Sequence, residues 1–481
     1  MSSEHNDQTE NRTEKLNWLS KQGIDPYGSR FDKAQPIDML VKGFTEGAQV
    51  STAGRLTAKR GHGGLAFADL RDASGKVQIC VKQDRVGEEA FKLFGELDLG
   101  DILGVSGSLF KTKTGEVTVQ ADRLTLLSKS LRPLPEKWHG LKDVEIRYRQ
   151  RYLDLIANEE ARSVFIKRSR LVGSLRKTLE DAGFMEVETP MMHDIPGGAA
   201  GEPFTTRHKA LDIDLYMRLA PELYLKKLLV GGFERVYELN RSFRNEGLST
   251  RHNPEFTMLE AYAAYQDYAF MMELVEKLIC NAAKELIGGL TFEYQGQAID
   301  LNPPWERVSF AETMEKMGLK PNATLEQMQA VLSKHKVQVK GATRSQMVRL
   351  VEQIFDPRTK SKPLFVVDYW TELSPLAKSK KEDPGITERF ELFIGGMEVA
   401  NAYSELNDPI EQKRRFESQL EASGAKAKDR AIDEGFVEAL EYGMPPAGGL
   451  GVGVDRLCML LLNQPSIKDV ILFPLLKPQA G

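Results

Sequence analysis

The stretch RVYELNRSFRNEGLSTRHNPEFTMLEAY, residues 235–262, carries the pattern that decides the fold of the larger part of this chain. Residues 236–240 and 255–262 are short apolar-rich runs with the alternation of β-strands, and residues 241–253 between them are polar. The stretch therefore predicts two neighbouring strands of a sheet joined by a long polar loop.

The second of these strands places polar and aromatic side chains on one face. Phe256, Met258, Glu260 and Tyr262 point to the same side, because side chains alternate along a strand. A carboxylate in such surroundings needs a polar partner or ligand, since leaving it unpaired costs several kcal/mol. The alternative is an edge strand whose polar face is in water.

The polar loop contributes cations. Arg241, Arg244 and Arg251 carry guanidinium groups, whose planar fork matches phosphate oxygens. The loop and the second strand together predict a site for a phosphate-bearing ligand.

Near the C-terminus, GGLGVGVDR at residues 448–456 precedes the apolar helix LCMLLLN. Glycines before a helix allow a ligand to approach the backbone closely. A dinucleotide-binding motif would follow the first strand of a βαβ unit and have an acidic residue about 20 positions later. This segment has only 25 residues after it, so that interpretation is set aside.

A third segment, EVANAYSE at residues 398–405, carries two glutamates. Asn401, Tyr403 and Glu405 fall on one face of a strand, whereas Glu398 has the opposite parity and reaches that face only through a bulge or a bend. Two carboxylates could hold Mg²⁺ against substrate phosphates, although a pair of glutamates taken alone is more typical of an exposed surface.

The N-terminal third has a different pattern. We expect disorder over residues 1–12, a short amphipathic helix over 13–22, and a barrel of short strands from Gln49 onward, with a helical stretch near 87–98. Residues 13–130 thus predict an OB-fold domain. Two prolines within three residues mark 131–142 as a linker.

Residues 143–481 predict a larger α+β unit. A long helix covers roughly 160–182, with leucines at 171, 175 and 179, and ends at Gly183. Residues 300–360 are helical and more polar, which indicates a helical insertion before strands resume at Leu364.

Composition excludes several classes of protein. The chain has 481 residues and a net charge of −4, from 65 Lys+Arg against 69 Asp+Glu, which argues against coating nucleic acid through bulk charge. No stretch is apolar enough to cross a bilayer, and the polar start has no signal-peptide pattern. Cys80, Cys280 and Cys458 are too far apart in sequence for a disulfide framework or zinc spacing. We therefore expect a cytoplasmic protein with no membrane association.

Three segments in this order resemble the signature motifs of class II aminoacyl-tRNA synthetases. They are the long helix followed by GFMEVETP (183–190), then FRNE (243–246), and the glycine-rich strand that ends in Arg456. The longer strings LRPLPEKWHGL, RYRQRYLDL, APELYLKKLLVGGFERVYELNRSFRNEG and ANAYSELNDP resemble bacterial-type lysyl-tRNA synthetases, from about residue 13 to the C-terminus.

This resemblance implies an α+β protein, with an N-terminal OB-fold anticodon-binding barrel and a catalytic domain built on an antiparallel sheet flanked by helices, with a small helical insertion. It implies ATP-dependent activation of L-lysine to lysyl-adenylate and transfer of lysine to tRNA(Lys) in protein synthesis. A homodimer formed through about residues 160–190 is expected.

The resemblance also implies roles around ATP. Arg244 would hold the α-phosphate and Arg456 the γ-phosphate, and these two are the expected catalytic residues. Adenine would stack between Phe256 and Arg456, with Glu246 and His252 lining the nucleotide site.

Lysine and metal follow in the same way. Glu222 and the backbone near Gly198 would receive the α-amino group of lysine, and Gly453 would floor the pocket. Glu398 and Glu405 would bind Mg²⁺. The side chain of lysine would be surrounded by Glu260, Tyr262, Asn401, Tyr403 and Glu405.

In the barrel, Phe67 and Gln78 fall on the faces opposite the apolar sets, where an outward aromatic and amide could receive an unpaired base. Arg55 matches a third anticodon contact of the family. One departure is Glu202, which stands where the family usually has arginine before Pro203-Phe204.

Three other interpretations compete. An aspartyl- or asparaginyl-tRNA synthetase shares the barrel and all three motifs, but its pocket needs a cation where Glu260 and Tyr262 stand. A translation-factor lysyltransferase would lack the barrel. A catalytically inactive RNA-binding relative would not need the intact set Arg244, Arg456, Glu398 and Glu405.

Overall fold

The computed structural model describes residues 3–32, 35–134, 141, 143–199, 201–319, 323–337, 339, 344–354, 361–423 and 432–479. The chain divides into two compact units, Met1–Lys142 and Asp143–Gly481, each with its own core. Most of the expected linker, residues 135–140 and 142, lies outside the described residues. Among the described residues, no helix is long and apolar enough to span a membrane.

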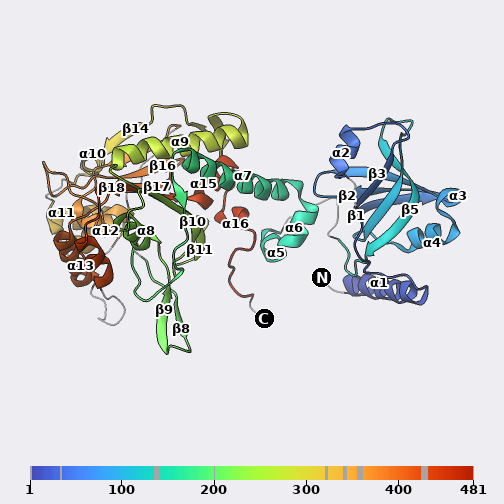
Figure 1. Cartoon of the computed structure of the whole chain (residues 1–481), viewed down its shortest axis with the longest axis horizontal. Helices are drawn as coiled ribbons and strands as arrows, with labels where there is room; N and C mark the ends of the chain where they lie inside the picture. The colour runs from blue at the N-terminus through green and yellow to red at the C-terminus, as the bar shows by residue number, and fades with distance from the viewer. Residues whose placement is uncertain are drawn as a thin grey trace. The chain divides into compact units, whose positions relative to one another are not determined.

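The first unit is a closed five-stranded barrel with the strand order β1-β2-β3-β5-β4 (Figure 1). Side chains of one parity fill its interior, among them Leu70, Ile79 and Val105, each 0% exposed. The barrel fold predicted from the alternating runs is therefore confirmed. Its strands are β1 (Gln49–His62), β2 (Leu65–Arg71), β3 (Lys76–Lys82), β4 (Ile102–Lys111) and β5 (Val117–Ser128).

Three further helices accompany the barrel. The helical stretch expected near 87–98 is α4 (Glu88–Glu96), which buries Leu93 and Phe94 against the barrel core. It follows the single turn of α3 (Gln83–Val86), and α2 (Ile37–Lys42) precedes the first strand.

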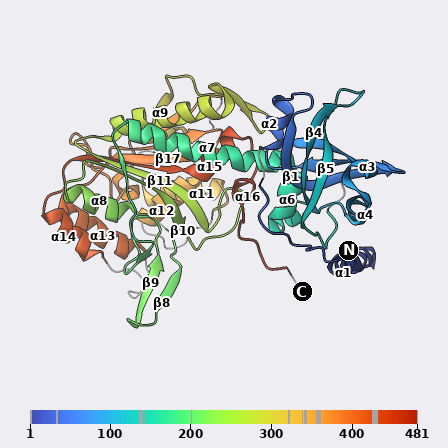
Figure 2. The ribbon, with the colours of Figure 1, turned by 45° about the vertical axis from the view of Figure 1, so that its right-hand side comes forward.

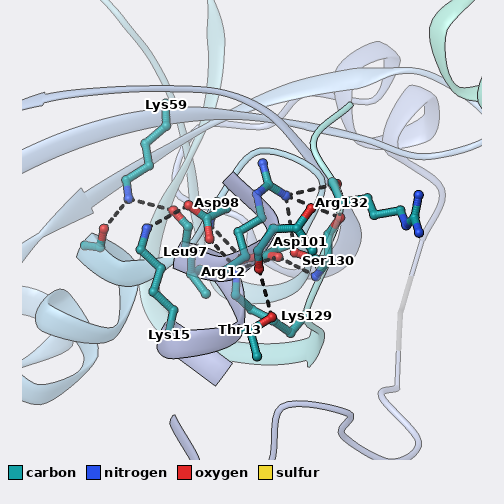
Figure 3. A network of polar contacts seen from close by, with 12 residues as sticks. Arg12, Thr13, Lys15, Lys59, Leu97, Asp98, Asp101, Lys129, Ser130 and Arg132 are labelled. Carbon is teal, nitrogen blue, oxygen red and sulfur yellow. Dashed lines mark hydrogen bonds and ion pairs between the residues drawn. The ribbon is translucent and has the colours of Figure 1, made fainter. Parts of the chain in front are cut away.

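The N-terminal helix α1 spans Ser3–Lys21, so the expected disorder up to residue 12 is wrong for residues 3–12. Polar contacts fix this helix to the barrel (Figure 3). Arg12 donates to the carbonyl oxygens of Ser130 (3.2 Å) and Arg132 (3.1 Å), and Lys15 forms an ion pair with Asp98 (2.7 Å). Residues 3–12 are almost entirely polar, and these distant partners supply stabilisation that a polar helix lacks by itself.

The second unit is built on an eight-stranded sheet of order β14-β15-β16-β17-β18-β11-β10-β6. The strands from β15 to β10 pair antiparallel, and the two outer pairs, β14–β15 and β10–β6, are parallel. The strands are β6 (Met185–Glu186), β10 (Arg235–Phe243), β11 (Glu255–Ala264), β14 (Glu306–Ser309), β15 (Leu364–Val367), β16 (Arg389–Ile394), β17 (Met397–Ser404) and β18 (Ala447–Gly453).

Long helices cover one face of this sheet. Helix α7 (Glu159–Asp181) and α9 (Tyr268–Ile287) lie side by side across it, as both views show (Figures 1 and 2). The leucines predicted to form the apolar stripe of α7, at 171, 175 and 179, are each 0% exposed. Gly183 follows the helix with φ +80°, the left-handed conformation that glycine adopts without strain. The covered face is the core, so ligands can approach only from the other face.

The expected insertion at 300–360 is only partly helical. Its first part, β14, is an edge strand of the main sheet and pairs in parallel with β15. Parallel neighbours need a long crossover connection, which the intervening helices supply. These are α10 (Phe310–Lys316), α11 (Leu325–Lys334) and α12 (Arg344–Gln353).

The remaining elements surround the sheet. Strands β8 and β9 form a hairpin that projects away from it in both views (Figures 1 and 2). The other elements are α5 (Val144–Arg149), α6 (Arg151–Ala157), β7 (Met192–His193), β8 (Thr205–His208), β9 (Ile213–Met217), α8 (Glu222–Val230), β12 (Thr291–Tyr294), β13 (Gln297–Asp300), the 3₁₀-helix η1 (Thr371–Leu373), α13 (Pro409–Ser423), α14 (Glu434–Glu441), α15 (Val454–Leu461) and α16 (Ile467–Val470).

Candidate active site

The face of the sheet opposite α7 and α9 floors a cavity of about 760 Å³. All four side chains that the sequence placed on one face of β11, from Phe256 to Tyr262, line this cavity, while Leu259 and Ala261 between them lie in the core. Strand β11 pairs with β10 on one side and β18 on the other, so the alternative of a solvated edge strand is wrong.

The glycine-rich segment forms β18 and the start of α15. Gly449 lies opposite both Tyr262 and Tyr403, and a Cβ atom there would meet Glu405 Oε1 at 1.9 Å. Gly453 also lines the cavity, at the end of the strand. The glycines leave room for neighbouring side chains and for a ligand on the sheet floor.

The bulge required for Glu398 is present and confirms the prediction. Phe393 pairs with Glu398 and Leu392 with Ala400, which leaves Val399 as the extra residue of β17. The bulge turns Glu398 to the cavity face, where Asn401 and Tyr403 also lie.

Arginines gather at the end of the cavity near Phe256. The guanidinium of Arg244 lies 5.1 Å from the centre of the Phe256 ring, and its buried Nε has no hydrogen-bond partner among the described residues. Arg456 donates to the carboxylate of Glu398 (3.1 Å) and lies 3.2 Å from His252 Nε2. Burial and the neighbouring Arg456 lower the pKa of His252, so this imidazole is neutral at pH 7.

Glu246 also lines the cavity at this end, as expected for the nucleotide site. Glu202 and Gly198 lie in the loop between β7 and β8 and line the same cavity. Gly198 has φ +81°, which favours glycine, and a Cβ atom there would lie 3.5 Å from Ala220 and Glu222.

Carboxylates gather at the other end of the cavity. Glu222, at the start of α8, and Glu260 are both 5% exposed. Tyr403 donates to Glu222 Oε1 (2.5 Å) and Tyr262 donates to Glu260 Oε2 (3.1 Å). Burial, with the Glu222 carboxylate nearby, raises the pKa of Glu260 to about 8. This end of the cavity is therefore suited to a ligand that brings positive charge.

Glu405 lies behind this group. It is 0% exposed, does not line the cavity, and forms an ion pair with the equally buried Lys226. Lys226 Nζ also donates to Glu222 Oε1 (2.7 Å). The predicted place of Asn401 is correct, and its amide oxygen accepts a hydrogen bond from Arg389 (3.1 Å).

Glu398 and Glu405 do not form one metal site. They are seven residues apart along an extended strand, which places their Cα atoms roughly 20 Å apart. A Mg²⁺ ion bound at about 2.1 Å cannot join carboxylates at that separation. Glu391, which was not predicted from the sequence, is a better partner for Glu398. Phe393 pairs with Glu398, and Glu391 is two residues from Phe393 on the same face of β16, so Glu391 and Glu398 are diagonal neighbours about 7–8 Å apart.

In the barrel, Arg55, Phe67 and Gln78 share the outer face of β1–β3, as the register requires. Phe67 is half-buried, but Gln78 is only 4% exposed. Its amide donates to Glu116 (2.9 Å) and accepts from Thr118 (3.0 Å). Gln78 therefore faces outward as predicted, but the prediction that its amide is available is wrong, because β3 lies between β2 and β5 and its neighbours cover Gln78.

Lys226 and Arg389 were also missed from the sequence. Lys226 follows Glu222 by one helical turn, so the string ELYLK carried a signal for an ion pair on one helix face. Arg389 has no comparable local signal, since its partner Asn401 comes from the next strand.

Comparison with known proteins agrees with this geometry. A family model described as tRNA synthetases class II (D, K and N) matches residues 143–477, and one described as OB-fold nucleic acid binding domain matches residues 50–127. Lysine–tRNA ligase of Carboxydothermus hydrogenoformans is 53% identical over 476 residues, which cover 97% of each chain. That of Pelotomaculum thermopropionicum is 54% identical over 477 residues, covering 97% of this chain and 94% of the relative.

The lysine–tRNA ligase of Bacillus subtilis is 48% identical over 487 residues, covering 98% of this chain and 97% of the relative. The matches include both units, so the similarity is not confined to the catalytic motifs. A cavity with arginines at one end and carboxylates at the other, on a sheet of this type, is consistent with them. The chain belongs to the lysine–tRNA ligases of the class II tRNA synthetases.

Proposed function

We propose that this chain uses ATP to activate L-lysine and then transfers the lysyl group to tRNA(Lys) in protein synthesis. The observation that carries the proposal is the charge separation along β11. Phe256 and Tyr262 are six residues apart, roughly 20 Å along the strand, with Arg244 at the first end and Glu260 near the second. ATP phosphates fit the first end and the ammonium groups of lysine fit the second.

In the first step the carboxylate of lysine attacks the α-phosphorus of ATP. A C–O–P bond forms, the bond from the α-phosphorus to the bridging oxygen breaks, and pyrophosphate leaves. The carboxylate is already a nucleophile, so no general base is needed. The protein aligns the reactants, and Arg244 and Arg456 neutralise charge on the phosphates.

The lysine subsites follow from the polar contacts. Glu222, beside Gly198, receives the α-amino group of lysine. Tyr403 orients the carboxylate of Glu222. Glu260 and Tyr262 receive the side-chain ammonium, with Glu405 behind them. In the second step, a hydroxyl of the terminal ribose of tRNA attacks the carbonyl of lysyl-adenylate, and AMP leaves.

Class II lysine–tRNA ligases use Mg²⁺ with ATP. Glu398 on β17 and Glu391 on β16 lie on the same face of the sheet, and these hard oxygen ligands would hold Mg²⁺ together with phosphate oxygens. Glu398 would share its carboxylate with Arg456, and Glu391 would exchange its bonds to Arg389 and Tyr369. The ion would neutralise charge on the departing pyrophosphate.

The barrel would bind the anticodon. Phe67 and Arg55 on the outer face of β1 and β2 would stack on and bond an unpaired base. Gln78 could take part only by exchanging its bonds to Glu116 and Thr118 for bonds to the base.

A homodimer formed through α7 and the segment after it is part of the proposal. Three large apolar side chains stand exposed there, Ile166 (46%), Met185 (43%) and Met192 (54%), as expected for a surface that a second copy covers. A cytoplasmic location is also part of the proposal. It is consistent with the three cysteines, which are buried and not paired in disulfides.

Pyrophosphate exchange tests the activity. Exchange into ATP should occur with lysine and with no other protein amino acid, and charging should be limited to tRNA(Lys). Exchange driven by aspartate or asparagine would contradict the proposal. For the assembly, sedimentation at micromolar concentration should give twice the 54.0 kDa mass, and a fully active monomer would rule out the dimer.

A further inference from the structure

A buried cation lies among the carboxylates of the lysine pocket. Lys226, on the second turn of α8, is 0% exposed and does not line the cavity. Its ammonium donates to Glu222 (2.7 Å) and forms an ion pair with Glu405. The rings of Tyr403 and Phe436 lie over it, at 5.5 and 5.9 Å from their centres. A lysine enclosed in this way is held in one place.

We propose that Lys226 is an internal counter-ion that sets the charge of the lysine pocket and so acts as a specificity-determining positioning residue. The inference rests on the proposed function, because it concerns the subsites for the two ammonium groups of the substrate.

The charges of the pocket and the substrate match when Lys226 is counted. Glu222, Glu260 and Glu405 carry three negative charges when ionised, and Lys226 reduces the sum to −2. Lysine brings two ammonium groups, one to each subsite, while its carboxylate faces ATP. Other cations act from farther away: Arg218, before α8, and Arg244, after β10, both influence Glu260.

Lys226 also leaves the right atoms available. It engages one oxygen of Glu222 and Oε2 of Glu405, whereas Glu405 Oε1 has no hydrogen-bond partner among the described residues. That oxygen lies beside Gly449, which lines the cavity. Lys226 therefore ties the subsite for the α-amino group to the subsite for the side-chain ammonium.

The ionisation of the carboxylates depends on this ammonium. Burial opposes its charge, yet Glu222 and Glu405 raise the pKa of Lys226 above its ordinary value. Burial and the carboxylates of Glu222 and Glu260 raise the pKa of Glu405 well above its ordinary value, and the ammonium of Lys226 limits this rise. Without Lys226 the pKa of Glu405 should rise further, so that its carboxyl group still has a proton to lose at higher pH when lysine binds.

Lys226→Met keeps the length of the side chain and removes the charge. We expect the KM for lysine to rise roughly 30-fold or more, or about 2 kcal/mol at 1.4 kcal/mol per tenfold, with the KM for ATP changed less than about twofold. Lys227→Met is the matched control, because Lys227 is the next residue and pairs only weakly with Asp433 (3.7 Å). An unchanged KM for lysine in Lys226→Met would overturn the inference.

Proton release separates a counter-ion from a packing role. Calorimetry of lysine binding, in buffers of different ionisation enthalpy over a series of pH values, should show proton release that continues to higher pH in Lys226→Met than in the unaltered protein, because the pKa of Glu405 rises further. The same pH dependence of proton release in both proteins would overturn the inference.

The double variant Lys226→Met/Glu405→Gln removes the charged pair together. It should fold more stably than Lys226→Met and should lose the proton release at higher pH that Lys226→Met shows, and release that persists there would overturn the inference. Failure of the proposed function is a separate outcome, since the unaltered protein would then show no lysine-dependent pyrophosphate exchange.

Discussion

Strands β11 and β3 both carry polar side chains on the face opposite an apolar core, but the two faces differ in what covers them. The polar face of β11 floors a cavity, where Glu260 accepts a hydrogen bond from Tyr262 and has a pKa raised to about 8. On β3, Gln78 is closed off by Glu116 and Thr118, which use both ends of its amide. Parity along a strand therefore shows which side a residue faces and leaves open whether a ligand can reach it.

The largest expected effect tests the open face at its cationic end. Arg456→Ala should lower lysine-dependent pyrophosphate exchange by about 100- to 1000-fold, as expected when a preorganised group that stabilises developing charge is removed. Arg414→Ala, at an exposed arginine on α13 whose side chain is 68% accessible, should have no effect. An Arg456→Ala protein with full activity would place the phosphates elsewhere.

The carboxylate end should respond next. Glu260→Gln keeps the shape of the side chain but removes its charge, so lysine-dependent exchange should fall roughly 30-fold, since losing one partner of a buried charge pair costs about 2–5 kcal/mol. ATP binding, measured separately, should change little, and proton release on lysine binding at pH 7 should fall by about one proton, the one that Glu260 gives up. Glu255→Gln, at an exposed glutamate on the opposite face of the same strand, serves as the control.

On the barrel, Phe67→Ala should reduce aminoacylation about tenfold, because a lost base-stacking contact costs about 1–3 kcal/mol. Exchange without tRNA should stay within about twofold, and thermal stability should be retained. Phe94→Ala gives the contrast, since Phe94 is 1% exposed and its loss should destabilise the barrel. Equal loss of exchange and charging in Phe67→Ala would defeat the anticodon assignment.

The smallest effect on activity is expected at the covered amide. Gln78→Ala should lower the free energy of unfolding by about 1 kcal/mol, because Glu116 and Thr118 lose a partner, and should change aminoacylation less than about threefold. Denaturant unfolding and charging assays on the same preparation measure both. A loss of charging above about tenfold with unchanged stability would mean that the amide leaves its internal bonds to read a base.

Much of the catalytic floor could be predicted because its pattern is local. The alternation from Phe256 to Tyr262 fixed a shared face, and the wrong parity of Glu398 required a bulge that the strand pairing contains. By contrast, the start of α1 depends on Arg12 reaching Ser130, a contact 118 residues away that no local pattern reveals. The predicted pairing of Glu398 with Glu405 at one metal ion was wrong for a related reason. The carboxylate that lies near Glu398 is Glu391, and it belongs to the neighbouring strand β16.

The sequence by itself determined the two units, the barrel, the faces of β11 and β17, and the family, because periodicity, glycine positions and motif order are properties of neighbouring residues. Only the tertiary structure decided which polar groups remain open to a ligand. Lys226 against Glu405 and Gln78 against Glu116 are partners brought together from distant segments. Whether a polar or charged side chain is paired within the protein or available to a ligand depends on the side chains that pack over it. In this fold those side chains come from another strand or helix.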